Sequence, residues 1–169
     1  SKAVAFTVSN STPDQIRILQ GGSVETPLDE VKPGVLSLFK GSEKLSSVTN
    51  EKNGRRKELA QWIASKDNPL TSRVIVNRVW QWHFGQALAG NPNNFGATGK
   101  KPTHPELLDW LAVDFQENGW NLKRLLKQMM MSRTFKQNSS TRTDLKDPEN
   151  KLWGRGPSYR LDAEVLRDI

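Results

Sequence analysis

The central helical pattern of this chain is NPLTSRVIVNRVWQWHFG, residues 68–85. Asn68 is favoured just before a helix, Pro69 suits the first helical position, and Gly85 suits the end. We therefore expect a helix from Pro69 to about Phe84. Its apolar side chains point nearly all round, which is typical of a central, buried helix. They are Leu70, Val74, Ile75, Val76, Val79, Trp80, Trp82 and Phe84.

Two polar residues interrupt this apolar surface. Arg73 and Asn77 project into the arc bounded by Leu70, Trp80 and Phe84 when the helix is drawn at 100° per residue. A buried guanidinium or amide without partners costs several kcal/mol. We therefore assign Arg73 and Asn77 to a structural polar core and expect both to donate hydrogen bonds to loop carbonyls.

The loop that follows, residues 90–102, is rich in glycine and asparagine. A connection of this length without secondary structure is unusual inside a small domain and is often functional. Phe95 lies in its middle. We expect an ordered, Ω-like loop in which Phe95 packs near Trp80 and Phe84.

A third helix is predicted after the loop. Thr103-His104-Pro105-Glu106 has the pattern of a capping box, in which the threonine accepts from an amide and the glutamate reaches back. Thr103 and Glu106 therefore join the structural polar residues. Trp110 falls on the polar side of this helix, and Gly119 ends it. Its predicted buried stripe consists of Leu107, Leu108, Leu111 and Phe115.

A helix at about 56–65 is expected before residue 68, and another to about Ser132 after Gly119. For the latter, Trp120 before the capping residue Asn121 and Leu125 beyond it have the spacing of a hydrophobic staple. Its predicted buried residues are Leu122, Leu125, Leu126, Met129 and Met130, and its predicted exposed residues are Lys123, Arg124 and Lys127.

The two ends of the chain are less regular. AVAFTV (3–8) and QIRIL (15–19) alternate as half-buried strands do, and STPD (11–14) between them predicts a turn and a β-hairpin. Residues 40–54 are polar and read as a linker. Asp147-Pro148 suggests a helix start, and RLDAEVLRDI (160–169) suggests the opening of a last, truncated helix.

These patterns predict a mainly α protein: a compact helical domain of about five helices with a small N-terminal β-hairpin. We divide it into an N-terminal hairpin and linker (1–54), a helical core (55–138) and a C-terminal extension (139–169). The net charge of +7 comes entirely from the core, which holds thirteen basic and six acidic residues. No apolar run approaches the roughly 18 residues of a membrane span.

Motifs for chemistry are weak. GATGKK (96–101) fails as a phosphate loop, because Asn94 stands at the leading glycine and Lys101 at the Ser/Thr position. The chain has no cysteine, and its two histidines, His83 and His104, lack a metal-ligand spacing. We assign no metal and no cofactor.

The basic residues permit a nucleic-acid face. Lys100, Lys101 and residues 55–57, with the basic residues after Asn121, could bind phosphates while Trp82 or Trp110 stacks on bases. No base-reading element is visible, so we expect weak, salt-sensitive binding and no specific nucleic-acid partner.

Several stretches together resemble one bacterial family. They are NPLTSRVIVNRVWQWHFG, PNNFG (92–96), PTHPELLDWLA (102–112), GWNLK (119–123) and MSRTFKQ (131–137), with VKPGVLSLF (31–39) and DPEN…RLDAEVLRD at the flanks. The chain is similar over 15–169 to the planctomycete-type domain-of-unknown-function family numbered fifteen fifty-three, which accompanies cytochrome-c-like modules. The chain departs from that family in two places. One is the stretch 20–23, and the other is Asn94, where the family usually has an aspartate.

The resemblance implies an exported or surface-associated protein of several domains, and it implies no reaction. We expect a binding module whose partner is a neighbouring domain or a carbohydrate. The binding residues would be Asn93, Asn94, His104 and Trp110 at the rim of the loop. A hydrolase-type or accessory catalytic domain using His83 and His104 is the alternative, and nonspecific nucleic-acid binding is a third.

Overall fold

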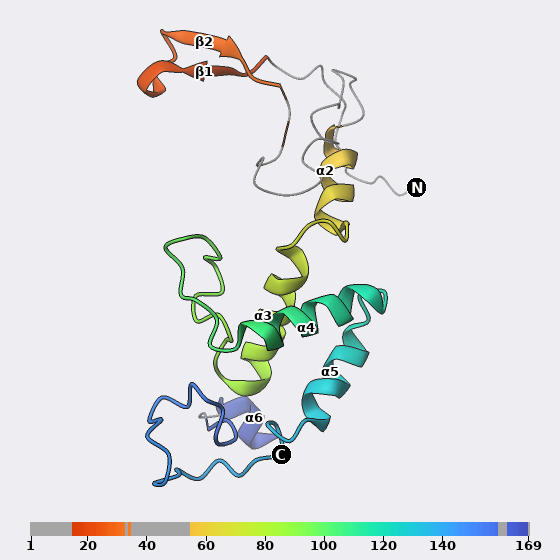
Figure 1. Ribbon diagram of the computed structural model, residues 1–169, viewed down its shortest axis with the longest axis vertical. Coiled ribbons are helices and arrows are strands. Elements are labelled where there is room, and N and C mark those ends of the chain that lie inside the picture. The colour runs from red at the N-terminus through yellow and green to blue at the C-terminus, as the bar shows by residue number, and fades with distance from the viewer. Residues whose placement is uncertain (1–14, 33, 35–54, 159–161, 169) are drawn as a thin grey trace. The chain divides into compact units, whose positions relative to one another are not determined.

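The computed structural model describes residues 15–32, 34, 55–158 and 162–168. The chain divides into two units, Ser1–Pro69 and Leu70–Ile169, and each is described by itself. The fold is mainly α with a small hairpin near the N-terminus, as expected (Figure 1). Its described elements are β1 (Arg17–Leu19), β2 (Pro27–Glu30), α2 (Arg55–Ala64), α3 (Thr71–Phe84), α4 (Pro105–Glu117), α5 (Leu122–Met131) and α6 (Ala163–Arg167).

The hairpin of the first unit differs from the predicted one. β1 pairs antiparallel with β2, and the turn between them contains the short 3-10 segment Gln20–Gly22. The predicted partner strand at 3–8 and the linker at 40–54 lie outside the described residues. Ile16 and Ile18 are 64% and 51% exposed. Their alternation therefore does not mark a half-buried strand face, contrary to our expectation.

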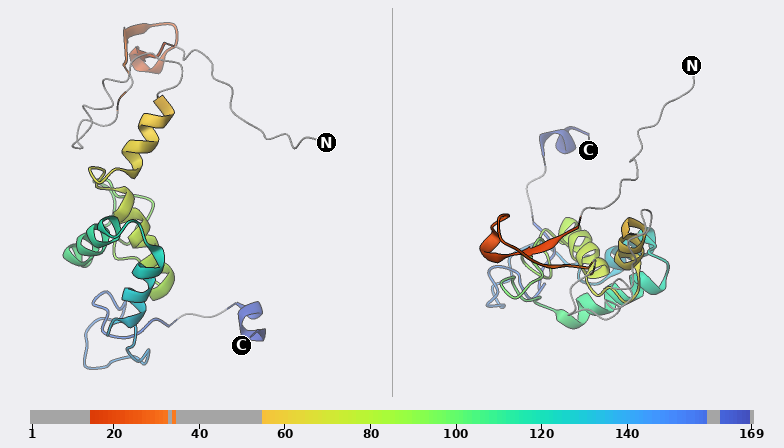
Figure 2. Two further views of the ribbon diagram at one scale, coloured as in Figure 1. Left: turned by 90° about the vertical axis from the view of Figure 1, so that its right-hand side faces the viewer. Right: turned by 90° about the horizontal axis from the view of Figure 1, so that it is seen from above.

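The core of the second unit is built by α3, α4 and α5. α3 packs against α4, and α4 against α5 (Figures 1 and 2). The buried apolar residues come from all three helices, from the turn after α3 and from one tryptophan far along the chain. They are Val76, Val79, Trp80, Phe84, Leu88, Ala89, Leu108, Leu111, Phe115, Leu125, Met129 and Trp153.

Helix α3 has the central role predicted for it, with two corrections. It begins at Thr71, two residues later than expected, because Pro69 and Leu70 form a turn. Gly85 ends it in the left-handed conformation (φ 79°), which glycine adopts without strain. Trp82, which we expected to be buried, is 68% exposed. Partners cover only part of the helix surface, and Trp82 lies outside that part.

The junction between α4 and α5 follows local rules. The amide of Trp120 donates to Phe115 O (2.9 Å) and the amide of Gly119 to Gln116 O (3.2 Å), which is a Schellman motif. The Trp120 ring meets the Phe115 ring edge-on at 5.3 Å. Asn121 then caps α5, accepting from the amide of Arg124 at 3.0 Å. The predicted end and start are thus both present.

The buried stripe of α5 is narrower than predicted. Leu125 and Met129 are buried, whereas Leu122 and Met130 are 47% and 48% exposed. Residues four apart lie on one side of a helix. A narrow contact with the core therefore covers Leu125 and Met129 and leaves the side chains next to them exposed to solvent. The expectation that Leu122 and Met130 are buried was wrong.

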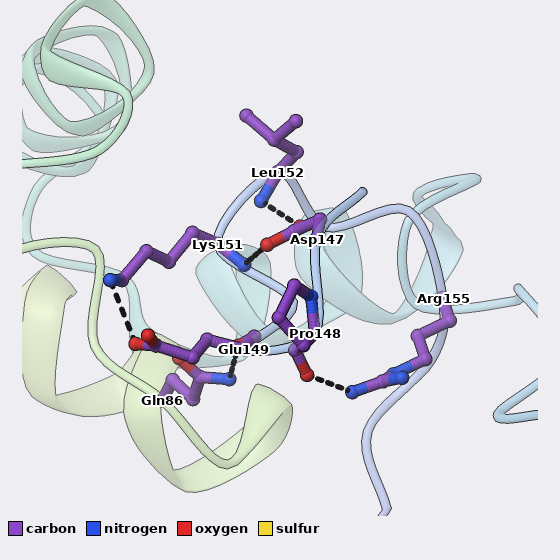
Figure 3. Close-up of polar contacts among 7 residues, drawn as sticks. All are labelled: Gln86, Asp147, Pro148, Glu149, Lys151, Leu152 and Arg155. Atoms are coloured by element: carbon purple, nitrogen blue, oxygen red, sulfur yellow. Dashed lines mark hydrogen bonds and ion pairs between the residues drawn. The ribbon is translucent and has the colours of Figure 1, made fainter. Parts of the chain in front are cut away.

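The helix start that we expected at Asp147-Pro148 is absent, and residues 147–155 form turns instead. The carboxylate of Asp147 accepts from the amides of Lys151 (2.9 Å) and Leu152 (2.7 Å) and holds two successive turns (Figure 3). Asn150 and Trp153 have φ values of 53° and 55°, which a right-handed helix cannot contain. The Asp-Pro pair therefore caps turns here.

These turns are tied to the core. Asn150 is buried, donates to Arg155 O (3.0 Å) and accepts from the Arg155 amide (3.2 Å). Gln137 Nε2 donates to Trp153 O at 2.8 Å. The Trp153 ring meets the rings of Trp80 and Phe84 edge-on, at 5.3 and 5.7 Å. Part of the segment 139–169 thus completes the helical core.

An ion pair joins α4 to α5 and makes stability depend on pH. Arg124 donates to Asp114 Oδ1 at 2.8 Å, and this bond lowers the pKa of Asp114 below its ordinary value. A lowered pKa in the folded state stabilises the fold above the unfolded-state pKa of about 3.9, and the effect is lost as pH falls through the folded-state value.

We expect Arg124→Gln to lower the free energy of unfolding by about 0.5–1 kcal/mol at pH 7. At an acidic pH below the lowered folded-state pKa of Asp114, where the carboxyl is protonated in both states, the difference from the parent should largely vanish. Urea denaturation at the two pH values measures this, with Lys123→Gln on the same helix as control. An equal loss at both pH values would show that the Arg124 stem, and not the ion pair, supplies the stability.

Candidate functional site

Asn77 is fully buried in α3 and binds the chain just before the loop. Its Nδ2 donates to Ala89 O (3.1 Å), and its Oδ1 accepts from the Ala89 amide (2.8 Å). The side chain satisfies both backbone groups of one residue, as a neighbouring strand would. Asn77 thus has the buried, hydrogen-bonded position that the helical projection predicts.

Arg73 differs from that projection. Its side chain is 31% exposed, and its Nε donates to Asp109 Oδ1 on α4 at 2.6 Å. The interaction is an ion pair between the two packed helices, at the surface and not in a buried arc. An arginine stem is long enough to bring its head group to the surface, which a helical projection does not take into account.

The predicted capping box is absent. Helix α4 begins at Pro105 with His104 as its capping residue, and no side chain caps it. Thr103 lies one position too early. Its amide donates to Leu88 O (2.9 Å), and its hydroxyl points to the same oxygen (3.4 Å). Thr103 therefore closes the base of the loop, beside the bridge between Ala89 and Pro102. Glu106 is exposed on the first turn of α4.

The loop is ordered by its own asparagine. Asn94 Oδ1 accepts from the Gly96 amide (3.0 Å), and Asn94 Nδ2 donates to Thr98 Oγ1 (2.9 Å). A Cβ at Gly99 would collide with the Asn94 carbonyl, so this close approach requires glycine. Phe95 packs half-buried against the core. Asn94 thus serves to hold the loop in shape.

Asn93 points outward and holds an arginine that we had not singled out. Arg78 donates from a terminal nitrogen to Asn93 Oδ1 at 2.8 Å, and both residues are exposed. Trp82, also exposed, lies one turn further along the same face of α3. The sequence signal for this surface was the i, i+4 spacing of Arg78 and Trp82. We missed it because the tryptophan was counted with the core.

Each of the two histidines has a local contact through its Nδ1 atom. His83 Nδ1 donates to Val79 O (2.8 Å) in its own helix, and His104 Nδ1 lies 3.0 Å from the hydroxyl of its neighbour Thr103. Among the described residues no group of three or more His, Cys, Asp or Glu side chains could hold a metal ion.

The four predicted binding residues have separate surroundings. Asn93 binds Arg78, Asn94 binds within the loop, and His104 contacts Thr103. Trp110 is 57% exposed on the outer side of α4, as the sequence predicted. Asn93 and Asn94 lie in the loop, His104 follows it and Trp110 lies in α4, and no hydrogen bond described above joins one of the four to another.

A second exposed group lies on α4 and α5. Trp110 and Val113 are three residues apart on the side of α4 opposite its buried residues, and Leu122, Met130 and Met131 are exposed on α5. We call these five the outer apolar residues. No helix in the described part of the chain is long and apolar enough to cross a membrane.

Comparison with known proteins gives one match. No curated protein and no solved structure is found to resemble the chain. Residues 55–169, more than half of the chain, match a family described as PSD1, protein of unknown function (DUF1553). The match covers α2 to α6 and therefore the whole helical part described above. The chain belongs to the PSD1 (DUF1553) family, whose function is unknown.

Proposed function

We propose that this chain is a non-catalytic binding module of a larger, exported bacterial protein and that it docks on a neighbouring domain of that protein. The outer apolar residues carry the proposal. Five exposed apolar side chains lie on two helices that pack against each other, and the proposal takes them together as one contact surface. Methionine and tryptophan are both common at such contacts.

Charges beside the outer apolar residues support a directed contact. Glu106 and Glu117 are exposed on α4, whereas Lys123 and Lys127 are exposed on α5. A partner with basic residues facing α4 and acidic residues facing α5 would bind in one orientation. In the reversed orientation, like charges would face each other and repel. The proposal places this site outside the cytoplasm. That location rests on the resemblance of the sequence to its family.

The catalytic alternative has less support. The roles assigned to His83 and His104 require a shared site, and each ring nitrogen described above is bound to its own surroundings. A carbohydrate partner has separate support from Arg78, Trp82 and Asn93, which is developed below.

The test is binding in trans between this chain and each other domain of its full-length protein, measured by calorimetry. We expect one domain to bind, and Trp110→Ala to weaken its Kd at least about tenfold, as for an interface tryptophan. Leu152→Ala is the control, since Leu152 is 66% exposed but is not one of the outer apolar residues. If no domain binds, or if Trp110→Ala and Leu152→Ala bind equally to the parent, the proposal is wrong.

A further inference from the structure

Arg78 differs in its partner from the arginines that form ion pairs. Arg73, Arg124 and Arg142 each donate to an aspartate. Arg78 donates to the neutral amide of Asn93, and no carboxylate lies within ion-pair distance of it in the described part of the chain. Its guanidinium is thus held in place while its charge stays uncompensated. Four of its five N–H donors remain for a ligand.

The support of this guanidinium is rigid. Asn93 belongs to the loop that Asn94 holds internally, and Asn77 and Thr103 fix the base of that loop through Ala89 and Leu88. Because Asn93 holds the arginine before a ligand binds, less conformational entropy is lost when the ligand binds. A planar, fixed guanidinium is suited to a carboxylate, which it can bind through two parallel hydrogen bonds.

Trp82 adds a flat apolar surface next to this charge. It is 68% exposed and lies four residues after Arg78, at a distance of about 5–6 Å between Cβ atoms on a helix. An exposed indole costs free energy in water, and the C–H face of a sugar ring can cover it while the hydroxyl groups stay hydrated. Arg78, Trp82 and Asn93 thus combine an apolar face, a cation and an amide.

We propose that Arg78, Trp82 and Asn93 form a binding site for an acidic saccharide. A sugar ring stacks on Trp82, its carboxylate pairs with Arg78, and Asn93 Nδ2 donates to a hydroxyl or ring oxygen. This site does not depend on docking through α4 and α5. A single-stranded nucleic acid fits less well, because such sites use several aromatic residues along a basic groove. Within the described part of α3, Trp82 is the one exposed aromatic on the face of Arg78.

Calorimetric titration of the full chain tests the site with two carboxylated probes, hexagalacturonate and hexamannuronate. Their methyl esters are the matched neutral probes. We expect at least one acid to bind with a Kd below about 1 mM, and its ester at least about tenfold more weakly. Trp82→Ala should weaken binding of both forms at least about tenfold. Arg78→Gln should remove the preference for the acid over the ester.

The control is Leu152→Ala, which removes an apolar side chain that is 66% exposed and belongs to neither proposed site, and it should leave saccharide binding unchanged. Thermal unfolding of each variant checks that the fold is intact. The proposal fails if neither acid shows saturable binding, if Trp82→Ala binds as the parent does, or if Leu152→Ala weakens binding as much as Trp82→Ala does. It also fails if oligothymidylate binds more tightly than both acids and requires the same two side chains.

Discussion

Trp153→Ala is expected to lower the free energy of unfolding by about 3–5 kcal/mol, the range for removing a buried aromatic side chain. Trp153 is 7% exposed, and its ring meets Trp80 and Phe84 edge-on. These rings are part of the core built by α3, α4 and α5. Losing Trp153 therefore opens a cavity beside the central helix, although the residue lies more than 60 positions further along the chain.

Urea denaturation followed by circular dichroism measures this loss of stability. Two further variants serve as comparisons. Trp153→Phe should cost less than about 1.5 kcal/mol, since its indole N–H has no hydrogen-bond partner in the described part of the chain. Trp82→Ala, at an exposed tryptophan on α3, should change stability by at most about 0.5 kcal/mol. If Trp153→Ala proved as mild as Trp82→Ala, residues 150–156 would be a detachable extension.

Asn77→Ala is expected to lower the free energy of unfolding by about 1–3 kcal/mol. The variant removes both hydrogen bonds to Ala89 and leaves a buried N–H and a buried C=O without partners. The smaller side chain also leaves a cavity where Asn77 was fully buried. A buried polar group that loses its partner costs more than the hydrogen bond contributed.

Hydrogen exchange at Ala89 gives the specific readout. Exchange of this amide should be faster in Asn77→Ala than in the parent, by more than at the amide of Leu125 in α5. Asn93→Ala is the matched control, because it removes an exposed asparagine of the same region. An unchanged denaturation midpoint in Asn77→Ala would show that the residue does not bind the loop base in solution.

The sequence by itself predicted the features that depend on neighbours a few residues away. Gly85 ends α3, Gly119 ends α4, and Asn121 caps α5, because each signal acts through the backbone within one turn. The burial and hydrogen bonding of Asn77 were also predictable, because an amide on a helix that is apolar nearly all round is buried and must have hydrogen-bond partners. The family resemblance is confirmed for residues 55–169.

Some local signals misled because two readings of the same residues compete. Thr103 and Glu106 have capping-box spacing, yet Thr103 closes the loop base and α4 begins without a side-chain cap. Asp147 caps turns and not a helix, because Asn150 and Trp153 adopt positive φ. Which partner such a side chain takes depends on backbone brought near by the rest of the fold.

Only the tertiary structure decided which apolar residues are buried and which polar residues meet. Trp82 belongs to an apolar helix but lies outside its covered surface, while Trp153 comes from a polar segment and completes the core. Arg78 meets Asn93 because the loop folds back along α3. Helical periodicity defines the faces of a helix, but the number of faces that are covered depends on contacts between residues distant in sequence.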